Sequence, residues 1–258
     1  MGLINIGDFM SSNNNNKINE NSINAEKLIE FSHICKYYEY DGGVIKALDD
    51  VNFNINKGEL VIILGDSGAG KSTALNILGG MDKATSGEVI VDNVKITNYE
   101  DEKLTDYRRN DIGFVFQFYN LVQNLTILEN VELATQISKN PFNPLEILER
   151  VGLNERVNNF PGQISGGEQQ RASIARAICK NPKILLCDEP TGALDYKTGK
   201  LILSLLQEIN ETYHMTVIIV THNSVIKDIG NKIIHFKSGK VESVIVNDNI
   251  KKASELEW

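Results

Sequence analysis

Gly65-Asp66-Ser67-Gly68-Ala69-Gly70-Lys71-Ser72 is the stretch of this sequence that decides the fold. Two glycines stand five positions apart and are followed by a lysine and a hydroxyl residue. The apolar run 60–64 leads into the stretch, and apolar residues at helical spacing follow it. This order predicts a strand, a glycine-rich loop and a helix, the context in which the motif binds phosphate. A plain glycine-rich turn is the alternative, but both flanking segments favour a nucleotide-phosphate site.

A loop of this kind binds an anion through its backbone. Its N–H groups wrap the phosphates, and the positive end of the following helix dipole adds to their field. Lys71 is expected to bridge the β- and γ-phosphates, and Ser72 to place its hydroxyl on Mg²⁺. The residues expected to contact the nucleotide are Gly65, Asp66, Ser67, Gly68, Ala69, Gly70, Lys71, Ser72 and Thr73.

The length and charge of the chain limit what it can be. With 258 residues it is long enough for one large α/β domain, or for a core with one inserted subdomain. With a formal net charge of −8, the chain lacks the excess of basic residues that is expected of a protein that binds DNA or RNA directly. The three cysteines stand far apart, without pairing or metal spacing, and this favours a reducing compartment.

No segment of the sequence reads as a membrane span or a secretory signal. No apolar run approaches the roughly 18 residues that a membrane helix requires. The first residues lack the basic-then-apolar order of a signal peptide. We therefore expect a soluble intracellular protein whose role at a membrane requires a partner chain.

Apolar strands alternate with helices along the chain. Residues 1–26 are rich in asparagine and serine and are expected to form a disordered tail, with the fold beginning near Leu28. The alternation predicts an α/β fold with a largely parallel sheet covered on both faces. From about 118 to 170 the pattern is helical, and Thr126 with Glu129 makes a capping-box start. This segment is expected to be a helical subdomain inserted into the core.

Two carboxylates follow the apolar strand expected at 184–187. Asp188 can hold the shell of a Mg²⁺ ion, and Glu189 can polarise a water for in-line attack on a γ-phosphate. A general base of this kind typically contributes ~10²–10⁴ in rate. A solvated turn is the alternative, which Pro190 would support. Together with the phosphate loop, the pair favours cleavage of a phosphate bond.

Ser165-Gly166-Gly167-Glu168 begins another expected helix. A capping box explains the serine and the glutamate but not the glycines. Each glycine costs about 1 kcal/mol relative to alanine in a helix interior, so two in succession suggest that something approaches the backbone closely. A phosphate at this helix N-terminus would meet that requirement. Because the chain already has one phosphate loop, the second anion site is expected to serve the nucleotide of another subunit.

Over residues 28–246 the sequence resembles the ATP-binding cassette (ABC) family, with five separated motifs in the family's order. The resemblance implies a P-loop NTPase (RecA-like) core with a mostly parallel sheet, an antiparallel β subdomain and an inserted helical subdomain. It also implies that residues 27–258 form an ABC ATPase domain, with ATP and Mg²⁺ as cofactors.

The resemblance assigns roles to residues outside the phosphate loop. Gln117 matches the glutamine loop, which touches Mg²⁺ and the attacking water and couples to the membrane subunit. A polar residue that merely ends a strand is the alternative there. His222 matches the switch histidine that contacts the γ-phosphate, although a lone histidine is more often structural. Asp195 matches the D-loop, which spans the dimer interface.

Two further matches concern the adenine and the second subunit. Tyr38 matches the aromatic residue that stacks on adenine, with Tyr37 and Tyr40 as rivals. Ser165-Gly166-Gly167-Glu168 matches the signature loop, which completes the active site of the opposite protomer. The chain departs from the commonest signature by having Ile164 for leucine and Glu168 for glutamine. Because glutamate still serves the capping role, ATPase activity is expected.

Three stretches, 79–87, 112–121 and 188–195, resemble the lipoprotein-release and macrolide-export branch of the family. The branch implies a homodimer formed on ATP binding. It also implies a separate integral-membrane permease, which holds this chain at the cytoplasmic face of the cell membrane. The implied task is export, lipoprotein release or antimicrobial-peptide resistance by mechanical coupling. One alternative is a regulator of cell-wall or division machinery that acts through a membrane partner. A cassette protein acting on ribosomes or DNA is disfavoured by the single cassette and the acidic charge, so no nucleic acid partner is expected.

The segment after Gln117 is expected to meet the membrane subunit. Phe118, Tyr119 and Leu121 would be apolar side chains left at a surface. Such patches usually mark partner sites.

Overall fold

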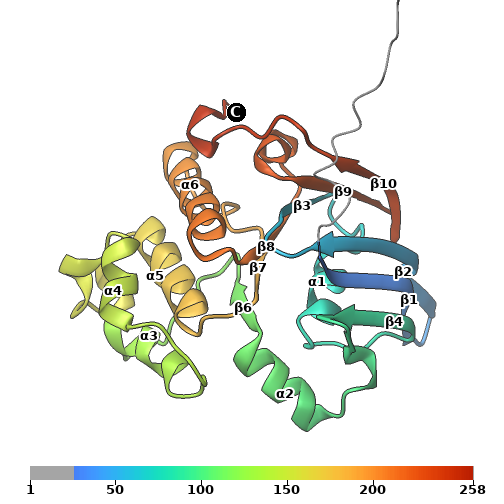
Figure 1. Cartoon of the computed structure of the whole chain (residues 1–258), viewed down its shortest axis with the longest axis horizontal. Coiled ribbons are helices and arrows are strands. Elements are labelled where there is room, and N and C mark those ends of the chain that lie inside the picture. The colour runs from blue at the N-terminus through green and yellow to red at the C-terminus, as the bar shows by residue number, and fades with distance from the viewer. Residues whose placement is uncertain (1–25, 258) are drawn as a thin grey trace, which may run out of the picture.

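The computed structural model describes residues 26–257 as two sheets and the helices that cover them (Figure 1). The tail expected at 1–26 lies, except for Glu26, outside the described residues. One sheet has six strands in the order β10-β9-β3-β8-β7-β6, and the other has four in the order β2-β1-β4-β5. The strands are β1 (Lys27–Tyr40), β2 (Gly43–Asn56), β3 (Leu60–Leu64), β4 (Ser86–Val91), β5 (Val94–Lys95), β6 (Ile112–Val115), β7 (Ile184–Asp188), β8 (Thr216–Thr221), β9 (Lys232–Lys237) and β10 (Lys240–Val246).

The helices connect these strands and cover the six-stranded sheet. In the part of the chain that the structure describes, none is long and apolar enough to cross a membrane. The α-helices are α1 (Lys71–Leu78), α2 (Asp101–Asn110), α3 (Ile127–Thr135), α4 (Pro144–Arg150), α5 (Gly166–Cys179) and α6 (Tyr196–Tyr213).

Strand β3 shows how the six-stranded sheet is buried on both faces. All of its residues are buried, as are those of its parallel neighbour β8. Leu60, Ile62 and Leu64 belong to a hydrophobic cluster with residues of α3, α5 and α6. Val61 and Ile63 belong to a second cluster, with residues of α1 and of the four-stranded sheet. The predicted parallel sheet is confirmed, and within residues 26–257 only β10 runs antiparallel in it, beside β9.

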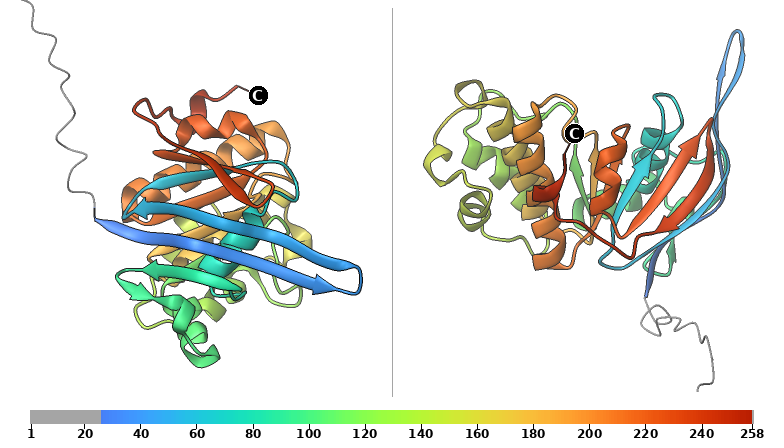
Figure 2. Two further views of the ribbon diagram at one scale, coloured as in Figure 1. Left: turned by 90° about the vertical axis from the view of Figure 1, so that its right-hand side faces the viewer. Right: turned by 90° about the horizontal axis from the view of Figure 1, so that it is seen from above.

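The four-stranded sheet is antiparallel and is dominated by the long hairpin β1–β2. Phe31 and Phe53 stack across the two strands with ring centroids 4.4 Å apart, and Phe53 meets Phe236 of β9 edge-on at 6.3 Å. These rings pack the hairpin against the six-stranded sheet. The tip of the hairpin projects beyond the body of the molecule (Figure 2). The antiparallel β subdomain that the resemblance implied is thus present.

Helices α3, α4 and α5 pack against one another on one side of the six-stranded sheet (Figure 1). The capping box predicted for the first of them is present. The Thr126 hydroxyl accepts a hydrogen bond from the backbone N–H of Glu129 at 3.2 Å, and the Glu129 carboxylate accepts one from the N–H of Thr126 at 2.7 Å. Helix α5 begins at Gly166 as predicted.

Helix α2 was not apparent from the sequence. It is strongly polar, and of its ten residues only Leu104 and Tyr107 are buried, so it shows no apolar stripe. The Tyr107 hydroxyl donates to the carbonyl of Leu78 at 2.9 Å, which ties α2 to the end of α1. Tertiary packing of two residues therefore places a helix that local periodicity does not predict.

Candidate active site

The glycine-rich loop lies between the end of β3 and the start of α1, as the sequence predicted. Gly70 adopts a φ of 100°, and a Cβ there would lie 2.4 Å from the carbonyl oxygen of Ala47. A Cβ on Gly65 would lie 2.3 Å from the carbonyl oxygen of Phe236. The loop is thus held close against β2 and β9, and only glycine fits at these two points. Its backbone N–H groups stand at the N-terminus of α1, where an anion is favoured.

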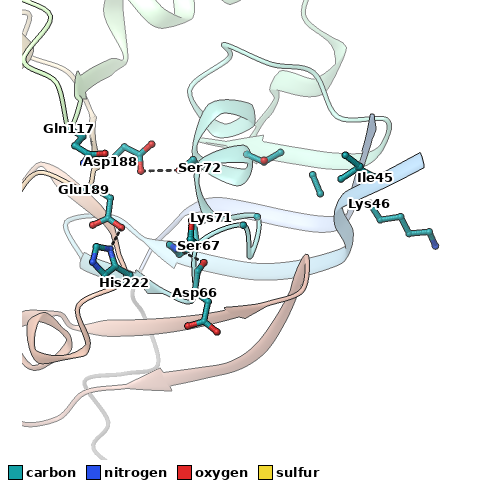
Figure 3. A pocket seen from close by; sticks show the side chains of 14 residues that line it. Ile45, Lys46, Asp66, Ser67, Lys71, Ser72, Gln117, Asp188, Glu189 and His222 are labelled. Atoms are coloured by element: carbon teal, nitrogen blue, oxygen red, sulfur yellow. Dashed lines mark hydrogen bonds and ion pairs between the residues drawn. The ribbon is translucent and has the colours of Figure 1, made fainter. Parts of the chain in front are cut away.

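A pocket of about 700 Å³ opens over this loop (Figure 3). Four strand ends meet here, because the carboxyl ends of the parallel strands β3, β6, β7 and β8 lie at one edge of the sheet. The pocket is lined by Ile45, Lys46, Ala47, Asp66, Ser67, Gly68, Gly70, Lys71, Ser72, Thr73, Gln117, Asp188, Glu189 and His222. The sequence had named eleven of these fourteen residues as site residues.

Lys71 is buried beneath the pocket, with 6% of its surface exposed. Its ammonium donates to the carbonyl oxygens of Gly65 at 2.6 Å and Asp66 at 2.8 Å. Both acceptors are neutral, and among the described residues no carboxylate forms an ion pair with it. Its charge is therefore available to a phosphate.

Oxygen-bearing side chains stand beside Lys71. The Ser72 hydroxyl donates to Asp188 Oδ1 at 3.1 Å, and Gln117 lies on the same side of the pocket (Figure 3). Burial raises the pKa of Asp188, and the nearby Glu189 raises it further. Over residues 26–257 no group of three or more His, Cys, Asp or Glu side chains could hold a metal ion. The donor set fits Mg²⁺, which usually takes one or two carboxylates and completes its shell with phosphate oxygens and water.

Glu189 and His222 meet on the wall of the pocket that faces the phosphate loop. His222 Nδ1 lies 2.7 Å from Glu189 Oε1. The histidine side chain is 69% exposed, whereas the glutamate side chain is 18% exposed. A Cβ on Gly192 would lie 3.2 Å from Gln117 Nε2, so the glutamine stands close to the loop that follows Glu189. The three side chains that the sequence named as catalytic therefore lie in one place.

Ser165-Gly166-Gly167-Glu168 is in a different part of the same chain. None of its four residues lines the described nucleotide pocket. Ser165 caps α5, and its hydroxyl donates to Glu168 Oε2 at 2.7 Å. This bond, the Ser165 N–H and the Arg156 guanidinium lower the pKa of Glu168 to about 2.

The two glycines of this loop have neighbours in their own chain. A Cβ on Gly166 would lie 2.7 Å from the Tyr119 hydroxyl, and one on Gly167 would lie 2.4 Å from Thr198 Cγ2. The sequence interpretation required a close approach to the backbone, and within the chain Tyr119 and Thr198 supply it. Binding of this loop to the phosphate of a nucleotide held by another subunit stays a prediction.

Comparison with known proteins decides the family. A sequence profile described as "ABC transporter" matches residues 48–192. The chain belongs to the ABC transporter family. The family prediction and its lipoprotein-release and macrolide-export branch are confirmed, as are the P-loop NTPase fold and the ABC-type ATPase activity.

Relatives within the family cover most of the chain. The uncharacterized ABC transporter ATP-binding protein MJ0796 of Methanocaldococcus jannaschii is 48% identical over 224 residues, which are 83% of this chain and 95% of that protein. The dimeric structure of MJ0796 bound to ADP and Pi has a TM-score of 0.78 at 44% identity, over 85% of this chain and 98% of that one. The methionine import ATP-binding protein MetN 1 of Staphylococcus aureus is 42% identical over 220 residues, 83% of this chain but 64% of that longer protein.

In this ABC cassette, Tyr38 lies at the rim of the pocket rather than in its lining. It pairs across the hairpin with Ile45, which does line the pocket, so both side chains share one face of the β1–β2 hairpin. The Tyr38 hydroxyl donates to Asp82 Oδ2 at 2.7 Å. Of its rivals, Tyr37 donates to Asp49 at 3.0 Å, and Tyr40 stands near the hairpin tip with 58% of its surface exposed. Tyr38 thus lies next to a pocket-lining residue, and its stacking on adenine stays a prediction.

Asp195 caps α6 and also lies beside Glu189 and His222. Its carboxylate accepts from the N–H of Thr198 at 3.1 Å and from the hydroxyl of the same residue at 2.6 Å, and these bonds lower its pKa. It lines a second hollow of about 170 Å³ together with Glu189 and His222. The D-loop position therefore lies close to two residues of the nucleotide pocket.

Sequence reasoning missed Ile45, Lys46 and Ala47, which also line the pocket. Ile45 and Lys46 lie across it from Glu189 (Figure 3). No motif marks them, because they reach the pocket through tertiary contacts: β2 pairs with β1, and the Ala47 carbonyl lies against Gly70 of the phosphate loop. The one available signal was the alternation of residues along β2, which has a polar lysine between two apolar neighbours.

We expect Lys71→Ala to weaken MgATP binding by about tenfold to a hundredfold, since hydrogen bonds to charged groups contribute about 1.5–3 kcal/mol each. Isothermal titration of purified protein with MgATP measures the change in Kd. Lys57→Ala is the matched control, because that side chain is 61% exposed and lies outside the pocket. An unchanged Kd for Lys71→Ala would contradict the proposal that the phosphate loop binds ATP through Lys71.

Proposed function

We propose that this ABC ATPase is the energy-supplying subunit of a membrane transporter and works as an ATP-driven head-to-tail homodimer. The observation that carries the proposal is that the phosphate loop and the signature loop, which the family resemblance assigns to one ATP site, do not meet within one chain. The phosphate loop and Glu189 share a pocket, while Ser165-Gly166-Gly167-Glu168 begins α5 outside it. A second copy, turned head to tail, brings each signature loop over the other copy's pocket.

The side chains divide the chemistry among themselves. Lys71 binds the terminal phosphates through its otherwise unpaired charge. Glu189 accepts the proton of the attacking water, and His222, joined to it at 2.7 Å, contacts the γ-phosphate. Ser72, Asp188 and Gln117 would hold Mg²⁺, which neutralises phosphate charge when bound.

The dimer is supported by a solved relative. The structure of MJ0796 with ADP and Pi is described as dimeric, and it covers 85% of this chain. The signature loop proposed to reach the partner's nucleotide is rigidly capped. Ser165 and Glu168 exchange hydrogen bonds with each other's backbone, at 2.8 Å and 3.3 Å. A preorganised loop loses little entropy when it docks on a phosphate.

The permease is proposed to dock between the sheet and the helical layer. A groove of about 320 Å³ lies there, with exposed Leu133 and Ile137 of the α3 region on one wall. Phe118, directly after Gln117, is 73% exposed. Phe118 is not among the residues that line the groove, but it stands two positions after Phe116, which is. Exposed apolar side chains that gather on a surface usually mark partner sites. The groove is lined by Phe114, Phe116, Leu133, Ala134, Ile137, Arg176, Ala177 and Lys180.

The expected apolar patch after Gln117 is present at Phe118, only partly exposed at Tyr119 and wrong at Leu121. Leu121 is 6% exposed and packs in the core cluster that includes α3. Tyr119 is half-buried, with its hydroxyl beside Gly166. The chain turns inward after Phe118, so that Leu121 fills the space under the helices. Phe118 is therefore the residue to test.

The branch motifs support export, lipoprotein release or peptide resistance by mechanical coupling, and we propose this class of task. For such a task the chain would be bound to the permease at the cytoplasmic face of the cell membrane. MetN 1 of S. aureus, by contrast, is named a methionine import protein. Reconstitution of the chain with its permease, followed by assays of lipoprotein release and of solute uptake, separates the two directions.

We expect Phe118→Asp to lower the ratio of membrane-bound to soluble chain by a factor of about ten or more. The reason is that a buried aromatic anchor commonly contributes more than 2 kcal/mol at an interface. Basal ATPase activity should be unchanged. Immunoblots of membrane and soluble fractions measure the partition. Val246→Asp is the control, because it also introduces an aspartate at an exposed apolar position, 66% exposed on β10. Equal membrane binding by Phe118→Asp and wild type would exclude Phe118 from the proposed docking surface.

A further inference from the structure

A buried hydroxyl holds the second oxygen of the Glu189 carboxylate. His222 Nδ1 lies 2.7 Å from Oε1, and the Thr221 hydroxyl lies 3.2 Å from Oε2. Thr221 is the last residue of β8 and is 1% exposed, whereas the histidine side chain is 69% exposed. One oxygen is thus held by an exposed ring and the other by a side chain fixed inside the sheet.

The direction of the Thr221 hydrogen bond follows from its other partner. The backbone N–H of Asn223 donates to the Thr221 hydroxyl oxygen at 3.1 Å. A hydroxyl has one proton, and with its oxygen accepting from Asn223 that proton is left for the carboxylate. Asn223 is itself fixed, since its side chain caps the 3₁₀ helix η5 (Ser224–Ile229) by accepting from the N–H of Val225 at 3.0 Å. The donor therefore points at the Glu189 carboxylate.

The backbone of Glu189 is also held in an unusual conformation. Its φ of 47° lies in the left-handed region, which is rare for a residue with a side chain. The N–H of Glu189 donates to the carbonyl of Val220 at 2.9 Å, and its own carbonyl accepts from Gly192 at 3.0 Å. Such a conformation persists only where the surroundings over-determine it. The strand end that supplies Val220 and Thr221 thus fixes both the backbone and the carboxylate.

We propose that Thr221 is a positioning residue that keeps the Glu189 carboxylate in place while His222 turns to the γ-phosphate. When the histidine serves the phosphate, Thr221 is the one remaining side-chain hydrogen-bond partner of Glu189 in the described part of the chain. A stiff β-branched residue inside a buried strand can hold that carboxylate still. The proposal rests on the function proposed above for Glu189 and goes beyond it by adding a residue that no motif contains.

Thr221→Val removes the hydroxyl and keeps the shape of the side chain. We expect kcat for ATP to fall about tenfold, the effect of about 1.4 kcal/mol lost from one charge-assisted hydrogen bond, with KM unchanged within about twofold. Thr221→Ala should match Thr221→Val, and Thr221→Ser, which restores the hydroxyl, should recover most of kcat. Melting temperatures of all three variants show that the fold is kept, and at least one of the two hydroxyl-free variants is expected to fold.

A comparison in a Glu189→Ala background separates positioning from a general structural role. If Thr221 acts through the carboxylate, Thr221→Val should not lower the residual single-turnover rate of Glu189→Ala any further. The same tenfold loss in that background would overturn the proposal, as would wild-type kcat in the folded single variants. A different result would contradict the proposed role of Glu189 as the general base: Glu189→Ala itself would then turn over ATP like the wild type.

Discussion

Replacing Glu189 by glutamine is expected to lower ATP turnover by about 10² or more, while ATP binding is kept. Glutamine has the same size and can still pair with His222 and with Thr221, which lie 2.7 Å and 3.2 Å from the carboxylate. It cannot accept a proton from water. Phosphate release at saturating MgATP measures turnover, and a separate titration measures nucleotide affinity.

Glu242→Gln is the matched control for that variant. The Glu242 side chain is 54% exposed and pairs with Lys237 at 2.8 Å, away from the nucleotide pocket. Its loss should leave turnover within about twofold, since exposed ion pairs contribute roughly 0–1 kcal/mol. Turnover by Glu189→Gln within tenfold of the wild type would assign proton transfer to another group.

The site could be predicted from the sequence wherever its residues are close neighbours along the chain or end a buried strand. The phosphate loop is one continuous stretch, so its motif needs no knowledge of the fold. Gln117, Asp188 and His222 each follow an apolar strand, and parallel strands bring their carboxyl ends to one edge. Strand order along the sheet was not needed for that inference.

The parts of the site that escaped prediction depend on register and packing. Ile45 reaches the pocket because β2 pairs with β1 so that it stands opposite Tyr38. Thr221 looks like one more residue of the strand, and its role follows only from the direction of its hydroxyl. Leu121 carries the same apolar side chain whether it faces a partner or fills the core. Each case is decided by contacts between distant segments.

The signature glycines show how one pattern can have two causes. Two successive glycines at the start of α5 suggested that a ligand approaches the backbone. Within the chain, Tyr119 and Thr198 already occupy the space that side chains at Gly166 and Gly167 would need. Substituting these glycines would therefore disturb the fold as well as any dimer. A test of the dimer is better made at Ser165, whose side chain is directed at its own capping box.

The ATP-bound dimer should accumulate in Glu189→Gln, because hydrolysis no longer separates the subunits. We expect the mass found by size-exclusion chromatography with light scattering to double from 28.7 kDa when ATP is added. Adding Ser165→Arg places bulk where the partner's γ-phosphate is proposed to dock. The double variant should remain monomeric at the same ATP concentration, while it still binds ATP through Lys71.

Loss of a helix cap alone must be separated from loss of the dimer contact. Replacing an N-cap residue typically costs about 1 kcal/mol of stability, and Ser165 caps α5 through a capping box. Thr126 caps α3 in the same way, so Glu189→Gln with Thr126→Arg carries the same kind of damage away from the proposed interface. This control should dimerise with ATP. A dimer formed equally well by the Ser165→Arg double variant would contradict the role of Ser165, and a Glu189→Gln protein that stays monomeric at saturating ATP would contradict the head-to-tail dimer.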